Sequence, residues 1–326
     1  MMDPRKRILF VLNFLFENTD ECHTVTVPEL VAHLNNCGFP VDRRAVYADI
    51  DLLRELGINI QKRRTRTHNY YLESRRFEMA ELKLLVDAVQ SCRFLTVTKS
   101  KQLIQKLETL ASKYQAVQLS RQVFVQNRIK TDNERIYSNV DSIHEAIQKA
   151  EKISFQYCQY TIQKTLTARR NGAYYIVSPY LLTWADDNYY LIGDHPYHEG
   201  LSHYRVDKMM DVTVIGETRK PLGPLFDPVA YAKSMFSMYA GERRWMEIAF
   251  DHSLAGVVID RFGTDVCLFP LNDSTFLIRA LISVSPAFFG WMLQFGDKAK
   301  IISPAEDREH MVALMEQALK NYKRNP

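Results

Sequence analysis

The stretch VDRRAVYADIDLLRELG, residues 41–57, decides how the first part of the chain folds. Its apolar residues recur with the period of an α-helix and predict a helix with one buried face. This inward stripe consists of Val46, Ile50 and Leu53, with Leu52 and Leu56 beside them. Asp42 is a suitable N-cap for the helix. Two arginines and a tyrosine follow the cap within the first turn and a half, namely Arg43, Arg44 and Tyr47.

A second helix is predicted just upstream of this stretch. The segment TVPEL places Thr26 as N-cap and Glu29 three residues later, which is the pattern of a capping box. Pro28 fits the first turn, where its missing N–H needs no partner. The helix should run to about residue 36, because Gly38 and Pro40 then break the chain.

Two helices joined by a short turn, with polar side chains at the front of the second, are typical of a helix-turn-helix. The second helix of that motif enters the major groove of DNA with its N-terminal end first. We therefore predict that Arg43, Arg44 and Tyr47 contact double-stranded DNA. The charges of this helix sum to slightly negative, so a solvated surface helix is the alternative.

The segment INIQKRRTRTHNYYLE, residues 58–73, alternates apolar and polar residues on both sides of a basic tip. This pattern predicts a two-stranded wing. Cations at such a tip lie along phosphates and add salt-dependent affinity without reading sequence. The predicted phosphate contacts are Lys62, Arg63, Arg64 and Arg66.

The rest of the chain changes from helical to β patterns and predicts an α+β multidomain protein. Two amphipathic helices are expected within residues 77–114, followed by a polar connector over 115–135. From residue 152, five or so short antiparallel strands suggest a small, strongly bent sheet or barrel, with a two-residue hairpin at Asn171-Gly172. Residues 245–322 have the order βαββαβ plus a final helix, which is ferredoxin-like. The expected domains are 1–76 (winged helix-turn-helix), 77–138 (helical linker and dimerisation region), 139–218 (β domain), 219–244 (connector) and 245–326 (C-terminal unit).

Composition places the chain among globular proteins. Hydrophobic residues make up 46% of its 326 residues and charged residues 25%, close to the average for folded domains. We see no apolar run of bilayer length and no signal-peptide pattern, and so expect no membrane association and a cytoplasmic location. The five cysteines form no CxxC pair, which argues against a disulfide scaffold or a thiolate zinc site.

Three segments of the β region carry a resemblance to the WYL domain of bacterial transcription regulators. They are VSPYLL (177–182), YYLIGD (189–194) and HYRVDKM (203–209). Tyr189 stands where the family has tryptophan, and Lys208 where it usually has arginine. The C-terminal stretch GWMLQFGDKAKIISP (290–304) resembles the extension, WCX-like, that often follows such domains. The resemblance implies a winged helix-turn-helix, an Sm-like WYL barrel that senses a nucleotide or single-stranded nucleic acid, and a homodimer.

The resemblance also directs attention to a ligand-binding set in the β region: Ser178, Tyr180, Tyr190, His203 and Arg205. Alternation along residues 202–207 puts His203, Arg205 and Asp207 on one face of a strand. A guanidinium among hydroxyls and rings suits phosphate pairing and base stacking. Two alternatives stay open, because the tyrosines could pack in the core and Arg205 could pair with Asp207 or with the carboxylate of another neighbour.

The segment GDHPYHEGLSH, residues 193–203, raises the question of a metal. It contains Asp194, His195, His198, Glu199 and His203 within ten residues, but spacing alone assigns no third ligand. We predict no metal and no cofactor. No GxSxG, Walker loop, HExxH or dinucleotide fingerprint occurs, so we do not expect an enzyme.

The function that this sequence favours is a ligand-responsive transcription regulator that binds palindromic operator DNA as a homodimer, a repressor rather than an activator. One alternative is an accessory protein whose β domain grips single-stranded RNA or DNA. A further alternative is a metal-dependent hydrolase built on residues 194–203.

Overall fold

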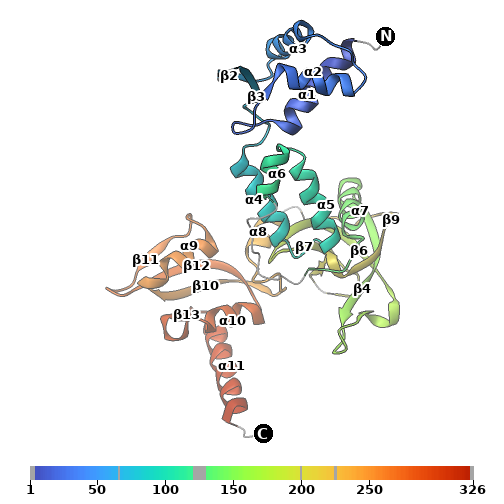
Figure 1. Cartoon of the computed structure of the whole chain (residues 1–326). Coiled ribbons are helices and arrows are strands. Elements are labelled where there is room, and N and C mark those ends of the chain that lie inside the picture. Colours follow the sequence, from blue (N-terminus) through green and yellow to red (C-terminus); the bar gives the residue numbers. More distant parts are fainter. Residues whose placement is uncertain (1–3, 65–66, 120–129, 199, 224–225, 324–326) are drawn as a thin grey trace. The chain divides into compact units, whose positions relative to one another are not determined.

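The computed structural model describes residues 4–64, 67–119, 130–198, 200–223 and 226–323 (Figure 1). The chain divides into two compact units, Met1–Glu134 and Arg135–Pro326. Each unit has its own apolar cores. In the described part of the chain no helix has the length and apolarity needed to cross a bilayer.

The first unit begins with three helices and a three-stranded antiparallel sheet of order β1-β3-β2. These elements are α1 (Pro4–Asn18), β1 (Val25–Thr26), α2 (Val27–Asn36), α3 (Arg43–Glu55), β2 (Ile60–Arg64) and β3 (His68–Leu72). Thr26 and Glu29 form the expected capping box, and the Asp42 side chain accepts a hydrogen bond from the Ala45 N–H at 2.9 Å. The chain thus follows the predicted plan of two joined helices and a hairpin.

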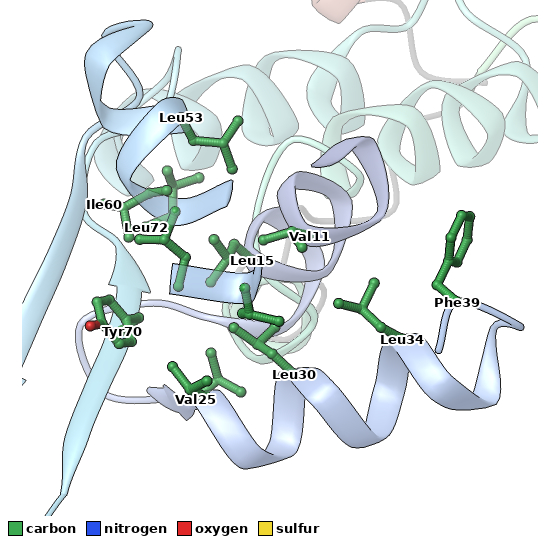
Figure 2. Packing of buried hydrophobic residues seen from close by; sticks show 13 residues of the cluster. Val11, Leu15, Val25, Leu30, Leu34, Phe39, Leu53, Ile60, Tyr70 and Leu72 are labelled. Carbon is green, nitrogen blue, oxygen red and sulfur yellow. The ribbon is translucent and has the colours of Figure 1, made fainter. Parts of the chain in front are cut away.

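One apolar cluster joins these elements, and residues of α1, α2 and the hairpin contribute to it (Figure 2). Val46, Ile50 and Leu53 of α3 are buried in this cluster, as the sequence predicts. The expectation for Leu52 and Leu56 is wrong, since they are 46% and 70% exposed. A helix of period 3.6 turns both side chains away from the stripe.

Three further helices complete the first unit: α4 (Met79–Ser91), α5 (Val97–Glu108) and α6 (Lys113–Leu119). Leu82 and Val86 of α4 pack against Ala111 and Leu119. The prediction that the connector begins at residue 115 is therefore wrong, because α6 continues to Leu119 and buries it. The Ser112 hydroxyl donates to Asp20 at 2.5 Å and ties this helical group to the N-terminal elements.

The second unit starts with a helix and a bent antiparallel sheet. The elements are α7 (Ile136–Lys149), β4 (Glu151–Tyr160), β5 (Leu166–Ala168), β6 (Tyr174–Ala185), β7 (Asn188–Asp194), β8 (Leu201–Arg205) and β9 (Met209–Thr218). The strand order is β5-β4-β6-β7-β8, and β9 pairs with the other edge of β4. β6 is long, and its first part pairs with β4 whereas its remainder pairs with β7.

The two-residue hairpin expected at Asn171-Gly172 does not form. β5 and β6 both pair with β4, at residues 158–160 and 153–156 respectively, and not with one another. Residues 169–173 bulge out between these pairings as a 3₁₀ turn. Asn171 and Gly172 have the positive φ that the dipeptide signals, 53° and 83°. A positive φ marks a turn, but it does not fix which strands pair.

The C-terminal part has a helix in the connector, α8 (Pro228–Lys233), and then a four-stranded sheet. Its elements are β10 (Glu242–Asp251), α9 (Ala255–Phe262), β11 (Leu268–Pro270), β12 (Thr275–Val284), α10 (Pro286–Leu293), β13 (Ala299–Ser303) and α11 (Ala305–Lys323). The order β11-β12-β10-β13 is wholly antiparallel. This is the βαββαβ arrangement with an added helix that the sequence predicts.

Candidate nucleic-acid interface and ligand cavity

The N-terminal end of α3 presents the predicted side chains to solvent. Arg43 and Arg44 are exposed and form no ion pair with any described residue, and Tyr47 is 39% exposed. The ring of Tyr47 meets that of Tyr70 edge-on, with 6.4 Å between centroids. Because Tyr70 belongs to β3, the front of α3 lies beside the hairpin.

Two polar contacts fix the orientation of α3. Arg7 of α1 binds the buried Asp49 with both ends of its fork, through Nε to Oδ2 at 2.6 Å and Nη2 to Oδ1 at 2.9 Å. Arg54 donates from Nε to the Ile60 carbonyl at 2.8 Å and lies 5.5 Å from the Tyr70 ring centroid. These residues position the exposed front of the helix. Their own polar groups are bonded to partners within the protein.

The hairpin carries three described cations, Lys62, Arg63 and Arg64, which we call the wing cations. All three are exposed on β2. Alternation places Lys62 and Arg64 on one face and Arg63 on the other, where its guanidinium lies 5.6 Å from the Tyr71 ring centroid. The predicted contact Arg66 lies outside the described residues.

In the second unit, Ser178 and Tyr180 bind the connector backbone. The Ser178 hydroxyl accepts a hydrogen bond from the Lys220 N–H at 3.0 Å. The Tyr180 hydroxyl donates to the Lys220 carbonyl at 2.8 Å, and the Arg219 guanidinium lies 5.5 Å from its ring centroid. Both side chains are almost fully buried. They therefore hold the chain where it leaves β9.

Arg205 and Tyr190 stand opposite one another across β7 and β8. Arg205 donates to both carboxylate oxygens of Asp207, at 3.1 and 2.8 Å, and to Oδ1 of Asn188 at 2.9 Å. The pairing with Asp207 that the sequence left open is thus present. Burial raises the pKa of Tyr190, so its hydroxyl stays protonated at neutral pH.

His203 behaves differently, because one of its ring nitrogens has no partner. Nδ1 donates to the Met238 carbonyl at 2.8 Å, since a carbonyl can only accept. Nε2 is buried without a hydrogen bond among the described residues. Burial lowers the pKa of His203, partly offset by the bond to Met238. The ring is therefore neutral at pH 7, and Nε2 is a buried acceptor.

A cavity of about 400 Å³ opens beside His203. Arginines, histidines and tyrosines dominate its described lining: Arg169, Arg170, His198, His203, Tyr157, Tyr175 and Tyr204. The Arg170 guanidinium lies 4.7 Å from the Tyr175 ring centroid and donates to His198 Nε2 at 3.3 Å. Of the five predicted ligand residues, His203 belongs to this lining.

The cavity is positive. No carboxylate occurs in its described lining, and neither arginine forms an ion pair with a described residue. The pKa of the neighbouring His195 is lowered by burial and also by the charges of His198 and Arg170. Sequence reasoning missed this site because Arg169 and Arg170 looked like the flank of a hairpin. The signal that could have found them is two adjacent arginines before a turn in an aromatic-rich sheet.

In the described part of residues 194–203 the histidines form no cluster with other possible metal ligands. Among the described residues no group of three or more possible ligands is found, and Glu199 lies outside them. His195 Nδ1 accepts from the Tyr197 N–H at 3.2 Å, and His198 contacts Arg170. Nδ1 of His195 and Nε2 of His198 thus have partners within the protein.

The fold and the cavity define a class of multidomain α+β protein. Its N-terminal part has two joined helices and a hairpin, and its β4–β9 sheet carries a cavity lined by arginines and aromatic rings. Family models agree with this class, since the WYL domain matches residues 138–214 and the WCX domain matches residues 242–319. The chain thus contains one region similar to the WYL domain and one similar to the WCX domain. The pair of matches supports a family of DNA-binding transcription regulators.

The comparison with solved structures includes proteasome accessory factor B/C (PafBC) of Arthrobacter aurescens. The two proteins share 16% identity, with a TM-score of 0.29. The match covers 99% of this chain and 49% of the other, so this chain spans about half the length of that protein. A comparison with curated proteins found no match.

Proposed function

We propose that this chain is a ligand-responsive, DNA-binding transcription regulator that acts as a homodimer, and we expect a repressor. The observation that carries the proposal is the front of α3, where Arg43, Arg44 and Tyr47 are exposed beside the basic hairpin. In helix-turn-helix proteins this end of the second helix contacts base edges. The contacts that α3 makes to α1 and β2 would hold it rigid during docking.

The N-terminus of α3 and the wing cations fit contacts with the DNA backbone. The backbone N–H groups at a helix N-terminus favour nearby phosphate. The wing cations would contact neighbouring phosphates and make binding depend on salt. In a dimer with two-fold symmetry the half-sites would lie roughly 34 Å apart on a palindromic operator.

The sensor in this proposal is the WYL domain. We propose that a nucleotide, or one end of a single strand, binds there and alters DNA affinity. The proposed ligand residues are those that the sequence predicts, Ser178, Tyr180, Tyr190, His203 and Arg205. Of these, His203 lines the described cavity, where Arg169, Arg170 and His198 would also contact the ligand. Support comes from the positive, ring-lined cavity, whose volume of about 400 Å³ lies in the usual range for small-molecule sites.

The test is selection of duplexes from a random library by the purified full chain, followed by gel retardation. The double variant Arg43→Ala with Arg44→Ala should lose binding to the selected duplex. A control variant with Lys101→Ala and Lys106→Ala removes two exposed charges from α5 in the same unit. Failure to enrich any duplex, or equal losses in both variants, would refute the proposal.

The cavity also favours a second candidate, an accessory protein whose main task is to grip single-stranded nucleic acid. Rings and arginines are the groups on which single strands stack. Competition separates the two functions. If unrelated single strands displace the selected duplex at equal concentration, the accessory role is supported and the regulator is not.

A further inference from the structure

The connector contains a short segment, residues 231–240, that belongs to two cores at once. Tyr231, Met235 and Met238 pack against Ile192 of the bent sheet. Phe236, between them in sequence, packs in the core of the C-terminal sheet. A movement of this segment would therefore disturb packing in both the bent sheet and the C-terminal sheet.

Direct bonds fasten the segment to the C-terminal sheet. The Ser283 N–H of β12 donates to the Ser234 carbonyl at 2.9 Å, and the two serine hydroxyls are 3.2 Å apart. Arg261 of α9 donates to the Met235 carbonyl and lies 3.9 Å from the ring centroid of Phe236. The amide of Ser283 thus reports how firmly the segment is held.

On the other side, the segment reaches the cavity. The Met238 carbonyl accepts the hydrogen bond from His203 Nδ1, and Ala240 forms part of the cavity lining. Ser237 and Met238 have φ of 47° and 56°, which side-chain-bearing residues adopt at a cost in energy. The His203 bond therefore holds a strained turn in place.

His203 lies between the segment and the cavity. Its Nδ1 is hydrogen-bonded to the segment, and its Nε2 is buried without a hydrogen-bond partner among the described residues. His203 also belongs to the lining of the cavity. Buried polar atoms without partners are rare in folded proteins. A ligand hydroxyl or amino group that donates to Nε2 would orient the ring and so strengthen or weaken its bond to Met238.

We propose that His203 couples occupancy of the cavity to the C-terminal sheet, β10–β13, through residues 234–240. The inference rests on the proposed function in that the cavity is taken as the sensor's ligand site. His203 is here a positioning residue for the connector. Ligand binding changes how tightly the strained turn is held, and Ser234 passes the change to β12.

Hydrogen exchange of the full chain tests this coupling without ligand. In His203→Ala the loss of one hydrogen bond should speed exchange of the Ser283 amide about two- to tenfold. The amide of Ile278, in the same strand, should keep its rate. His198→Ala is the matched control, since it changes the cavity wall and the His198 ring bonds to Arg170 rather than to the connector. Unchanged Ser283 exchange in His203→Ala would overturn the coupling.

A second variant separates the two nitrogens. In His203→Asn the amide group stands near Nδ1 and can still donate to Met238, but no atom replaces Nε2. This variant should exchange like the wild type without ligand. With each 5′-mononucleotide, or a 5′-phosphorylated oligonucleotide, as probe, Ser283 exchange should change in the wild type and not in His203→Asn.

The outcomes are distinguishable from failure of the proposed function. If none of these probes binds, the sensor part of the proposed function fails, and the ligand-free arm still decides the coupling. If a probe binds both proteins, as calorimetry shows, and shifts Ser283 exchange equally in both, the role of Nε2 is refuted. A shift with mononucleotides alone would identify the free nucleotide, rather than a strand end, as the source.

Discussion

Removing the Arg7 guanidinium should destabilise the N-terminal helices strongly. Asp49 keeps 8% of its side-chain exposure and receives two short hydrogen bonds from Arg7, whose pKa this pairing raises. In Arg7→Ala the Asp49 carboxylate would stay buried without a partner. Truncating one member of a buried pair costs about 3 to 5 kcal/mol. Because Arg7 retains 21% exposure and water can reach it, we expect about 3 kcal/mol.

The assay must report on the first unit alone. All three tryptophans, Trp184, Trp245 and Trp291, lie in the second unit, so tryptophan fluorescence would miss the change. Native-state hydrogen exchange of the Ile50 and Leu53 amides follows opening of α3 itself. A loss of about 3 kcal/mol corresponds to exchange roughly a hundredfold faster.

A double variant provides the control for this prediction. Arg7→Met with Asp49→Leu removes both charges and fills the space with apolar groups, which is often neutral or stabilising. Its exchange should return to within about tenfold of the wild type. The reasoning is refuted if Arg7→Ala speeds exchange less than about fivefold, or if the double variant is no better than the single one.

Three further predictions concern function and pH. Arg44→Ala should cost about 1 to 3 kcal/mol of specific DNA binding if Arg44 reads a base, and equal losses on random DNA in a titration would make it a phosphate contact. Replacing the three wing cations by alanine should reduce the slope of log affinity against log salt by about 2.7, and an unchanged slope would remove the wing from the interface. Because burial lowers the pKa of His203, its contribution to stability is full above about pH 6.5 and falls as the pH drops below that value. Melting curves should show a smaller loss on acidification in His203→Gln than in the wild type, while His195, whose pKa is also lowered, retains its share.

The sequence was most informative where a local rule fixes an element. The Thr26 capping box and the Asp42 cap set the starts of α2 and α3, and the core stripe of α3 followed from its period. The order of the C-terminal elements was also readable, because strand and helix patterns alternate distinctly along that part of the sequence.

Pairing between distant segments could not be predicted in this way. Asn171-Gly172 indicated positive φ correctly. The strands on its two sides, β5 and β6, nevertheless pair with β4 and not with one another. The cavity depends on that same event, since the bulged turn carries Arg170 to Tyr175 and His198. The partner of Arg205 was a choice between open alternatives that only the fold of β8 resolves.

The central claim is that the front of α3 lies against duplex DNA. A photoreactive amino acid in place of Tyr47 tests it most directly, with the same group at the exposed Tyr137 of α7 as the control. We predict that position 47 cross-links to bases of a selected duplex and that position 137 does not. Retention of DNA binding with no cross-link from position 47 would contradict the account.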